Sequence, residues 1–119
     1  MRALSAVMES LPMMPELTDE AVARAVQGGD AEAFGELMRR YEPKLTRYGR
    51  RFLGDSDAIE DAVQETFVKA YEHIKGFDAG RRFSPWIYRI AHNAFASILR
   101  SRSRSPVIAL DLDALVPHA

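Results

Sequence analysis

Apolar residues recur at helical spacing along most of the chain, in four segments that are separated by short glycine-containing breaks. No segment shows the sustained alternation of apolar and polar residues that is typical of a strand, and β-branched residues are sparse. The pattern therefore predicts an all-α protein, a compact three- to four-helix bundle. The expected helices cover residues 18–27, 30–53, 56–75 and 84–103.

End signals support these boundaries. Thr18 is a good N-cap for the first helix, and the glycine pair 28–29 is a stop signal after it. Ser84-Pro85 combines an N-cap residue with a proline at the first helical position. Pro43 lies inside the second helix, and we expect it to kink or divide that helix because it lacks an N–H group and crowds the preceding turn.

One face of each helix is expected to form the core. In the second helix this face comprises Phe34, Leu37, Met38, Tyr41, Leu45, Tyr48 and Phe52. In the third it comprises Ile59, Ala62, Val63, Phe67, Ala70, Tyr71 and Ile74. In the fourth it comprises Trp86, Ile87, Ile90, Ala91, Ala94, Ile98 and Leu99.

Length and composition limit the domain organisation and the chemistry. A chain of 119 residues allows one small domain, which we place at residues 17–104. We expect residues 1–16 to be a disordered leader and residues 105–119 to be a linker, and no apolar run is long enough to span a membrane. The absence of cysteine excludes disulfides, thiolate metal sites and cysteine nucleophiles.

Charge is strongly segregated although the net charge is only −1. Residues 55–65 contain five acidic residues and no Lys or Arg, whereas residues 81–104 contain six Arg and no acidic residue. A small body with an acidic and a basic pole suits a protein that bridges a basic protein surface and a nucleic acid.

The acidic segment forms a stripe at helical spacing, opposite the apolar face of the same helix. Its members are Asp57, Glu60, Asp61, Gln64 and Glu65. Complementation of the helix dipole, together with solubility, would explain Asp57 and Glu60 but not Gln64 and Glu65 in the third turn. A di-iron centre is excluded because Ala70 and Arg89 stand where the Glu of a Glu-x-x-His pair would precede His73 and His92.

The basic segment combines aromatic, cationic and amide side chains near a flexible loop. The loop, roughly residues 76–83, contains Phe77, Arg81 and Arg82, and the helix after it is expected to project Tyr88, Arg89, His92 and Asn93. Stacking on aromatic rings and base-edge contacts by amides are typical of single-stranded nucleic-acid binding. Alternatively, Trp86 and Tyr88 belong to the core and Phe77 anchors the loop to the body.

The basic face of the second helix, residues 39–51, is interpreted as a solvated face.

No nucleophile elbow, phosphate-binding glycine loop or supported catalytic triad is present, so the sequence does not indicate an enzyme. We also expect no cofactor and no metal.

Three segments, within about residues 20–104, resemble region 2 of the extracytoplasmic-function (ECF) sigma factors, the specificity subunits of bacterial RNA polymerase. They are QGGDAEAFGELMRRYEPKL, DAIEDAVQETFVKAYEHIKGFD and RRFSPWIYRIAHNAFASILRSRSR. The resemblance implies a sigma region 2 fold and a role in recognising and melting the promoter minus-ten element.

The resemblance also implies roles for individual residues. Asp61, Gln64 and Glu65 match the surface that docks on the clamp helices of the largest polymerase subunit. The walls of a pocket for a base flipped from the non-template strand match Lys69, Phe77, Tyr88 and Ile90. Asn93 matches a position that reads DNA at the duplex edge, and Arg100 is expected to contact phosphates. Arg89 and Ile90 replace the tandem tryptophans of primary sigma factors, which implies weaker melting.

A cytoplasmic protein regulated by an anti-sigma factor is a further implication. The sequence ends in what would be the linker to region 4, the domain that reads the minus-thirty-five element, so we expect region 4 to be absent from this chain. Two other classes stay open from the residues alone: a free-standing helix-turn-helix regulator of double-stranded DNA and a protein-interaction module.

Overall fold

The computed structural model describes residues 16–102, and within them the chain is helical and contains no strand. The all-α prediction is therefore confirmed. The leader and linker expected at the two ends lie outside the described residues, except for Glu16. The elements are α2 (Asp19–Gln27), η2 (Ala31–Ala33), α3 (Phe34–Gly49), α4 (Ser56–His73), η3 (Ile74–Gly76) and α5 (Phe83–Arg102), where η marks a 3₁₀ helix.

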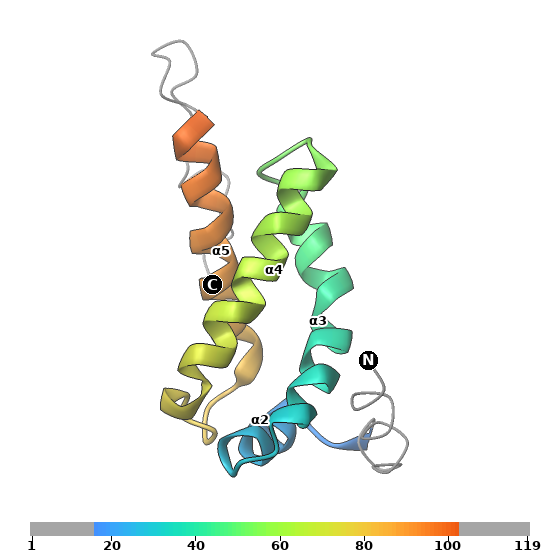
Figure 1. Ribbon diagram of the computed structural model, residues 1–119, viewed down its shortest axis with the longest axis vertical. Coiled ribbons are helices and arrows are strands. Elements are labelled where there is room, and N and C mark those ends of the chain that lie inside the picture. The colour runs from blue at the N-terminus through green and yellow to red at the C-terminus, as the bar shows by residue number, and fades with distance from the viewer. Residues whose placement is uncertain (1–15, 103–119) are drawn as a thin grey trace.

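Three long helices stand side by side, and the short α2 lies across one end of them (Figure 1). Helix α4 runs antiparallel to α3 and α5. It packs against both of these helices, and α2 contacts α3, α5 and η3. This arrangement leaves one outer face of α4 and one of α5 without a covering element among the described residues.

Helix α2 has the predicted boundaries. The Thr18 hydroxyl accepts a hydrogen bond from the Ala21 N–H at 3.0 Å, which is the expected N-cap contact. At the other end the Asp30 N–H donates to the Ala25 carbonyl at 3.0 Å, and Gly29 has a φ of 112°. This is a Schellman ending, and the positive φ explains why glycine stands at position 29.

The next two predicted helices differ from the structure at their ends. The helix predicted over 56–75 ends as α4 at His73, and residues 74 and 75 belong to η3. The segment predicted as one helix over 30–53 begins with η2 and ends as α3 at Gly49, while the buried Phe52 and Leu53 follow in the connection. Helix α3 continues through Pro43, so of the two expected effects of this proline a division of the helix does not occur, and a kink stays a prediction.

Helix α5 starts at Phe83, before the predicted Ser84-Pro85 signal, because a residue from another helix caps it. The Glu20 carboxylate on α2 accepts a hydrogen bond from the Phe83 N–H at 2.7 Å. A carboxylate at a helix N-terminus satisfies a free N–H and complements the helix dipole.

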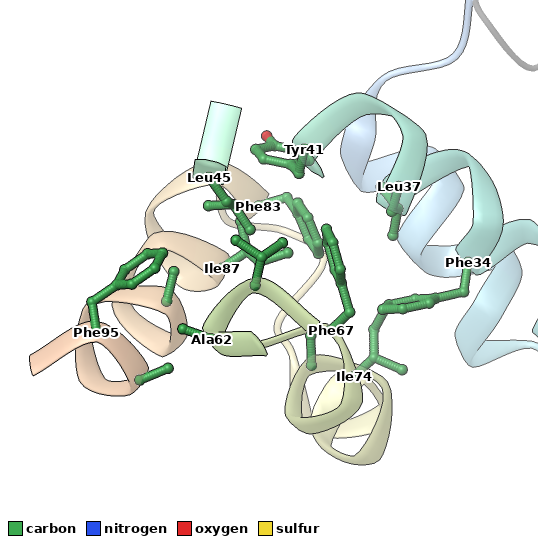
Figure 2. Packing of buried hydrophobic residues seen from close by; sticks show 14 of the residues in the cluster. Phe34, Leu37, Tyr41, Leu45, Ala62, Phe67, Ile74, Phe83, Ile87 and Phe95 are labelled. Atoms are coloured by element: carbon green, nitrogen blue, oxygen red, sulfur yellow. The ribbon is translucent and has the colours of Figure 1, made fainter. Parts of the chain in front are cut away.

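The core is rich in aromatic rings contributed by all three long helices (Figure 2). Tyr41 and Phe83 lie with ring centroids 5.4 Å apart, and Phe52 stacks on Phe95 at 5.5 Å. Phe95 is fully buried although the predicted stripe omitted it. A Cβ atom at Gly49 would lie 2.6 Å from the Phe95 ring, so glycine is what lets α3 and α5 approach this closely.

Two residues assigned to the core stripes are in fact exposed. Met38 is 40% exposed and Tyr71 is 47% exposed. Each lies at the edge of its stripe, where the apolar arc of the helix is wider than the surface that the neighbouring helices cover. Tyr71 still contacts the core with one edge, since its ring packs against Phe34 at 5.2 Å.

A buried ionic network joins α2 to α3. Glu36 is only 3% exposed and forms ion pairs with Arg39 at 2.6 Å and Arg40 at 2.7 Å. Arg40 also reaches Asp19 on α2 at 2.8 Å, and Asp19 accepts a hydrogen bond from the Tyr41 hydroxyl. The carboxylate of Glu36 is thus buried with its charge compensated.

Candidate protein and nucleic-acid interfaces

The acidic stripe lies on the exposed side of α4. All five members, Asp57, Glu60, Asp61, Gln64 and Glu65, are exposed, while the opposite side of the helix is buried. Asp55 caps this helix by accepting from the Asp57 N–H at 3.0 Å, and this bond, together with Arg102 at 3.2 Å, lowers the pKa of Asp55. The N-terminus of α4 is therefore already capped by Asp55. The stripe extends well beyond the first turn, so complementation of the helix dipole does not account for all of it.

An apolar groove of about 600 Å³ runs beside the stripe between α3 and α4. Its apolar lining includes Met38, Ile59 and Val63, and two stripe residues, Glu60 and Gln64, form part of its wall. The exposure of Met38 is explained by its place in this groove. Acidic and amide groups beside an apolar groove are suited to binding another protein chain.

Helix α5 presents two different faces. Arg89, Asn93 and Arg100 lie on its exposed side, at positions i, i+4 and i+11, which share one face of a helix. Tyr88 and His92 are half-buried. The predicted DNA-binding residues of this helix are thus brought into one region, with the charged and amide groups outermost.

Tyr88 and His92 pack toward α3. The rings of Tyr88 and Tyr48 are 5.2 Å apart, edge to face, and the Tyr48 hydroxyl lies 3.4 Å from His92 Nδ1. Burial raises the pKa of both tyrosines, so both phenols are neutral at physiological pH. Tyr48 was assigned only to the core by its spacing, but it shares this surface with the residues predicted to bind DNA.

Phe77 does not offer an open ring face. It is 5% exposed, and its ring packs against Phe83 at 5.4 Å and Trp86 at 5.1 Å. The alternative that Phe77 anchors the loop to the body describes the structure. Lys69, expected beside Phe77 in the base pocket, lies on the exposed side of α4, 3.7 Å from Glu65.

The loop before α5 is held by helix α2. The Gln27 side-chain amide donates to the carbonyls of Ile74 at 2.8 Å and Phe77 at 2.7 Å, and the Arg24 guanidinium donates to the Ala79 carbonyl at 3.0 Å. Sequence reasoning missed these contacts because about 50 residues separate the partners and a lone Gln or Arg on a helix carries no signal. They fix the position from which Arg81 and Arg82 project.

A second, basic groove of about 510 Å³ lies between α3 and the start of α5. Its cationic lining residues are Lys44, Arg47, Arg51 and Arg82. Lys44 and Arg47 lie on α3, and Arg51 follows the end of this helix at Gly49; all three belong to the basic face of residues 39–51 that the sequence pattern favours as a solvated face. The fold places that face next to Tyr88 and Arg82, which the sequence pattern did not indicate.

Within residues 16–102, no three or more acidic or histidine side chains are grouped so that they could hold a metal ion. In the same part of the chain, no helix combines the length and apolar character needed to cross a membrane.

Comparison with known proteins gives a consistent set of relatives. Residues 37–105 match the model of the family described as sigma-70 region 2. The chain is 40% identical over 94 residues to the ECF RNA polymerase sigma-E factor of Haemophilus influenzae and 37% identical over 103 residues to that of Escherichia coli K12. These alignments cover 79% and 87% of this chain but 49% and 53% of the relatives, so the chain spans about half of their length.

The similar solved structures include two complexes. One is the NMR structure of an engineered region 2 of sigmaE in complex with GTAAAA, with a TM-score of 0.69, 39% identity, and coverage of 80% of this chain and 97% of that one. The other is CnrH in complex with the cytosolic domain of CnrY, with a TM-score of 0.65, 30% identity, and coverage of 82% and 61%.

Proposed function

The chain belongs to the sigma-70 region 2 family, and from this premise we propose that it is the region 2 part of an ECF RNA polymerase sigma factor. In this role it docks on the polymerase core, recognises the non-template strand of the promoter minus-ten element and helps to melt it. We assign it no catalytic step, because the polymerase carries out the chemistry.

The observation that carries this proposal is the exposed face of α5. Arg89, Asn93 and Arg100 stand in one row on a helix whose inner side is packed in the core. Arginines attract phosphates without regard to sequence, whereas an asparagine amide offers a donor and an acceptor to a base edge. The similar region 2 of sigmaE was solved with the oligonucleotide GTAAAA, which supports the same class of ligand here.

The remaining residues of the proposed DNA surface flank this row. Arg81 and Arg82 project from the braced loop, and Tyr88 and His92 lie on the side toward α3. For Lys69 and Phe77, only the family resemblance supports a place in the walls of a base pocket.

We further propose that the acidic stripe on α4 binds the clamp helices of the polymerase core. Its five side chains are exposed and do not contribute to the core, and the four carboxylates among them can select a partner by charge. Complementarity of charge predicts a basic surface on that partner.

The stripe is tested by the double substitution Asp61→Lys/Glu65→Lys. We expect binding to the polymerase core to weaken at least about tenfold, which corresponds to ~1.4 kcal/mol. The fold should survive, since exposed charges contribute only about 0–1 kcal/mol to stability. Binding is measured by titrating labelled protein with core polymerase.

Glu16→Lys/Glu32→Lys is the matched control, because it changes the net charge equally at exposed acidic residues outside α4. If both double variants lose the same affinity, or if neither loses any, the stripe is not the docking surface.

A regulatory partner is a second proposed ligand. CnrH was solved with the cytosolic domain of CnrY, and we propose that an anti-sigma protein binds this chain in the α3–α4 groove. Because Glu60 and Gln64 belong to both the groove and the stripe, such a partner would compete with the polymerase core.

A further inference from the structure

We propose that the basic groove between α3 and α5 binds a single-stranded segment of nucleic acid, with its phosphates on the arginines and one unstacked base on the tyrosine rings. This inference rests on the proposed function. It adds a contact surface on α3 to the DNA surface of α5.

The charge of the groove is uniformly positive. Its lining contains Lys44, Arg47, Arg51 and Arg82 and no Asp or Glu. Within residues 16–102, none of these four cations forms an ion pair, whereas the neighbouring Arg39 of α3 is paired with Glu36. Four exposed, uncompensated cations around one concavity make a site for a polyanion.

The aromatic lining distinguishes a nucleic acid from other polyanions. Tyr48 and Tyr88 are half-buried in the groove and stand edge to face, so their rings are rigidly held. The Arg51 guanidinium lies 6.0 Å from the centre of the Tyr48 ring. Fixed aromatic rings beside cations are the arrangement that binds unstacked bases. A duplex keeps its bases stacked and offers none for such a contact.

The groove adjoins the proposed base-reading row of α5. Arg82 and Tyr88 line the groove, and the Tyr48 hydroxyl lies 3.4 Å from His92, the residue before Asn93. A single DNA strand whose base is recognised by Asn93 therefore needs to extend only a short way around α5 to enter the groove. The groove would hold the strand in the unpaired form.

Arg51→Gln and Arg50→Gln form a matched pair for the test. The two arginines are neighbours in sequence and both exposed, but Arg51 lines the basic groove and Arg50 lines the α3–α4 groove. Affinity for a fluorescein-labelled single-stranded minus-ten oligonucleotide is measured by anisotropy at several salt concentrations, on the protein without polymerase core, so that the α3–α4 groove proposed for protein partners plays no part in the measurement.

We expect Arg51→Gln, and separately Arg47→Gln, to weaken binding about three- to tenfold and to reduce the slope of log K against log salt by about 0.7 each. Arg50→Gln should leave both the affinity and the slope unchanged. Tyr48→Leu should weaken binding without changing the slope, and circular dichroism checks that each variant is folded. If Tyr48→Leu does not fold, the two arginine variants still decide the result.

Three results would overturn the inference. The first is an equal loss in Arg50→Gln and Arg51→Gln, which would indicate only a general effect of charge. The second is an equal effect of the arginine variants on a duplex of the same sequence. The third is displacement of the oligonucleotide by polyglutamate of equal charge. If the wild-type protein binds no oligonucleotide, the proposed function itself fails; if it binds and only the groove variants are silent, the groove inference alone fails.

Discussion

Glu36 shows how one buried side chain links sequence to stability. Its carboxylate is almost fully buried, and the hydrogen bond from Arg39 is the main cause that lowers its pKa from the ordinary value of 4.5. Arg40 extends the same contact to Asp19 on α2. These ion pairs therefore hold α2 against α3. Helix α2 in turn holds the loop before α5 through hydrogen bonds.

We expect Glu36→Gln to reduce the free energy of unfolding at pH 7 by about 1.5–3 kcal/mol, since a charge-assisted hydrogen bond is lost. A lowered folded-state pKa gives a contribution that is complete above the unfolded-state pKa and is lost as the pH falls through the folded-state pKa. The difference between wild type and variant should therefore shrink below about pH 4.5. Urea unfolding followed by Trp86 fluorescence measures it.

Glu32→Gln is the control, since Glu32 is exposed and makes no ion pair within residues 16–102. A constant difference between Glu36→Gln and wild type from pH 7 to pH 3 would show that the buried carboxylate is not the source of the stability.

Prediction from sequence succeeded for side chains that act within one helix and failed for those that act between helices. The Thr18 cap and the exposure of the α4 stripe follow from local spacing, so the pattern found them. For Phe77, in contrast, the sequence leaves open whether the ring faces a base or anchors the loop to the body, and its burial depends on contacts with Phe83 and Trp86 of α5. A hydrophobic ring in a loop carries no local signal that separates these outcomes.

Helix α2 is the element whose purpose was least visible in the sequence. It is short, and its apolar face accounts only for its own packing against the core. Its polar side supplies Glu20 to the N-terminus of α5, Arg24 to Ala79 and Gln27 to Ile74 and Phe77. The helix thus positions the loop and the start of the proposed DNA-binding helix together.

Gln27→Glu tests this positioning. The introduced carboxylate cannot donate to the two carbonyls that the amide serves, so we expect stability at pH 7 to fall by about 1–3 kcal/mol. Amide hydrogen exchange at Phe77 and Arg81 should accelerate, because both N–H groups are bonded within the braced loop. Acidification should restore part of the loss, since a protonated carboxyl donates again.

The same change at an exposed position of α4, Gln64→Glu, is the control and should leave exchange in the loop unaltered. Unchanged exchange at Phe77 in Gln27→Glu would mean that the loop is held by its aromatic contacts alone.

The molecule as a whole separates two kinds of surface. The acidic stripe and its apolar groove lie on α4 and α3, whereas the arginine-rich and aromatic surfaces lie on α5, the loop and the other side of α3. Segregation of charge in the sequence predicted these poles, because each pole lies within one segment. The basic groove was not predictable, since Tyr48 and Tyr88 meet only when α3 and α5 pack.

Base reading by α5 is tested most directly by comparing Asn93→Ala with Arg100→Ala on a panel of single-stranded minus-ten oligonucleotides at several salt concentrations, with polymerase core present. Arg100→Ala should weaken binding to all sequences alike. It should also reduce the slope of log K against log salt by about 0.7, as expected for the loss of one phosphate contact. Asn93→Ala should leave the salt dependence intact and cost about 1–3 kcal/mol of discrimination between promoter variants. The same sequence-independent loss in both variants would contradict base reading and leave α5 as an electrostatic track.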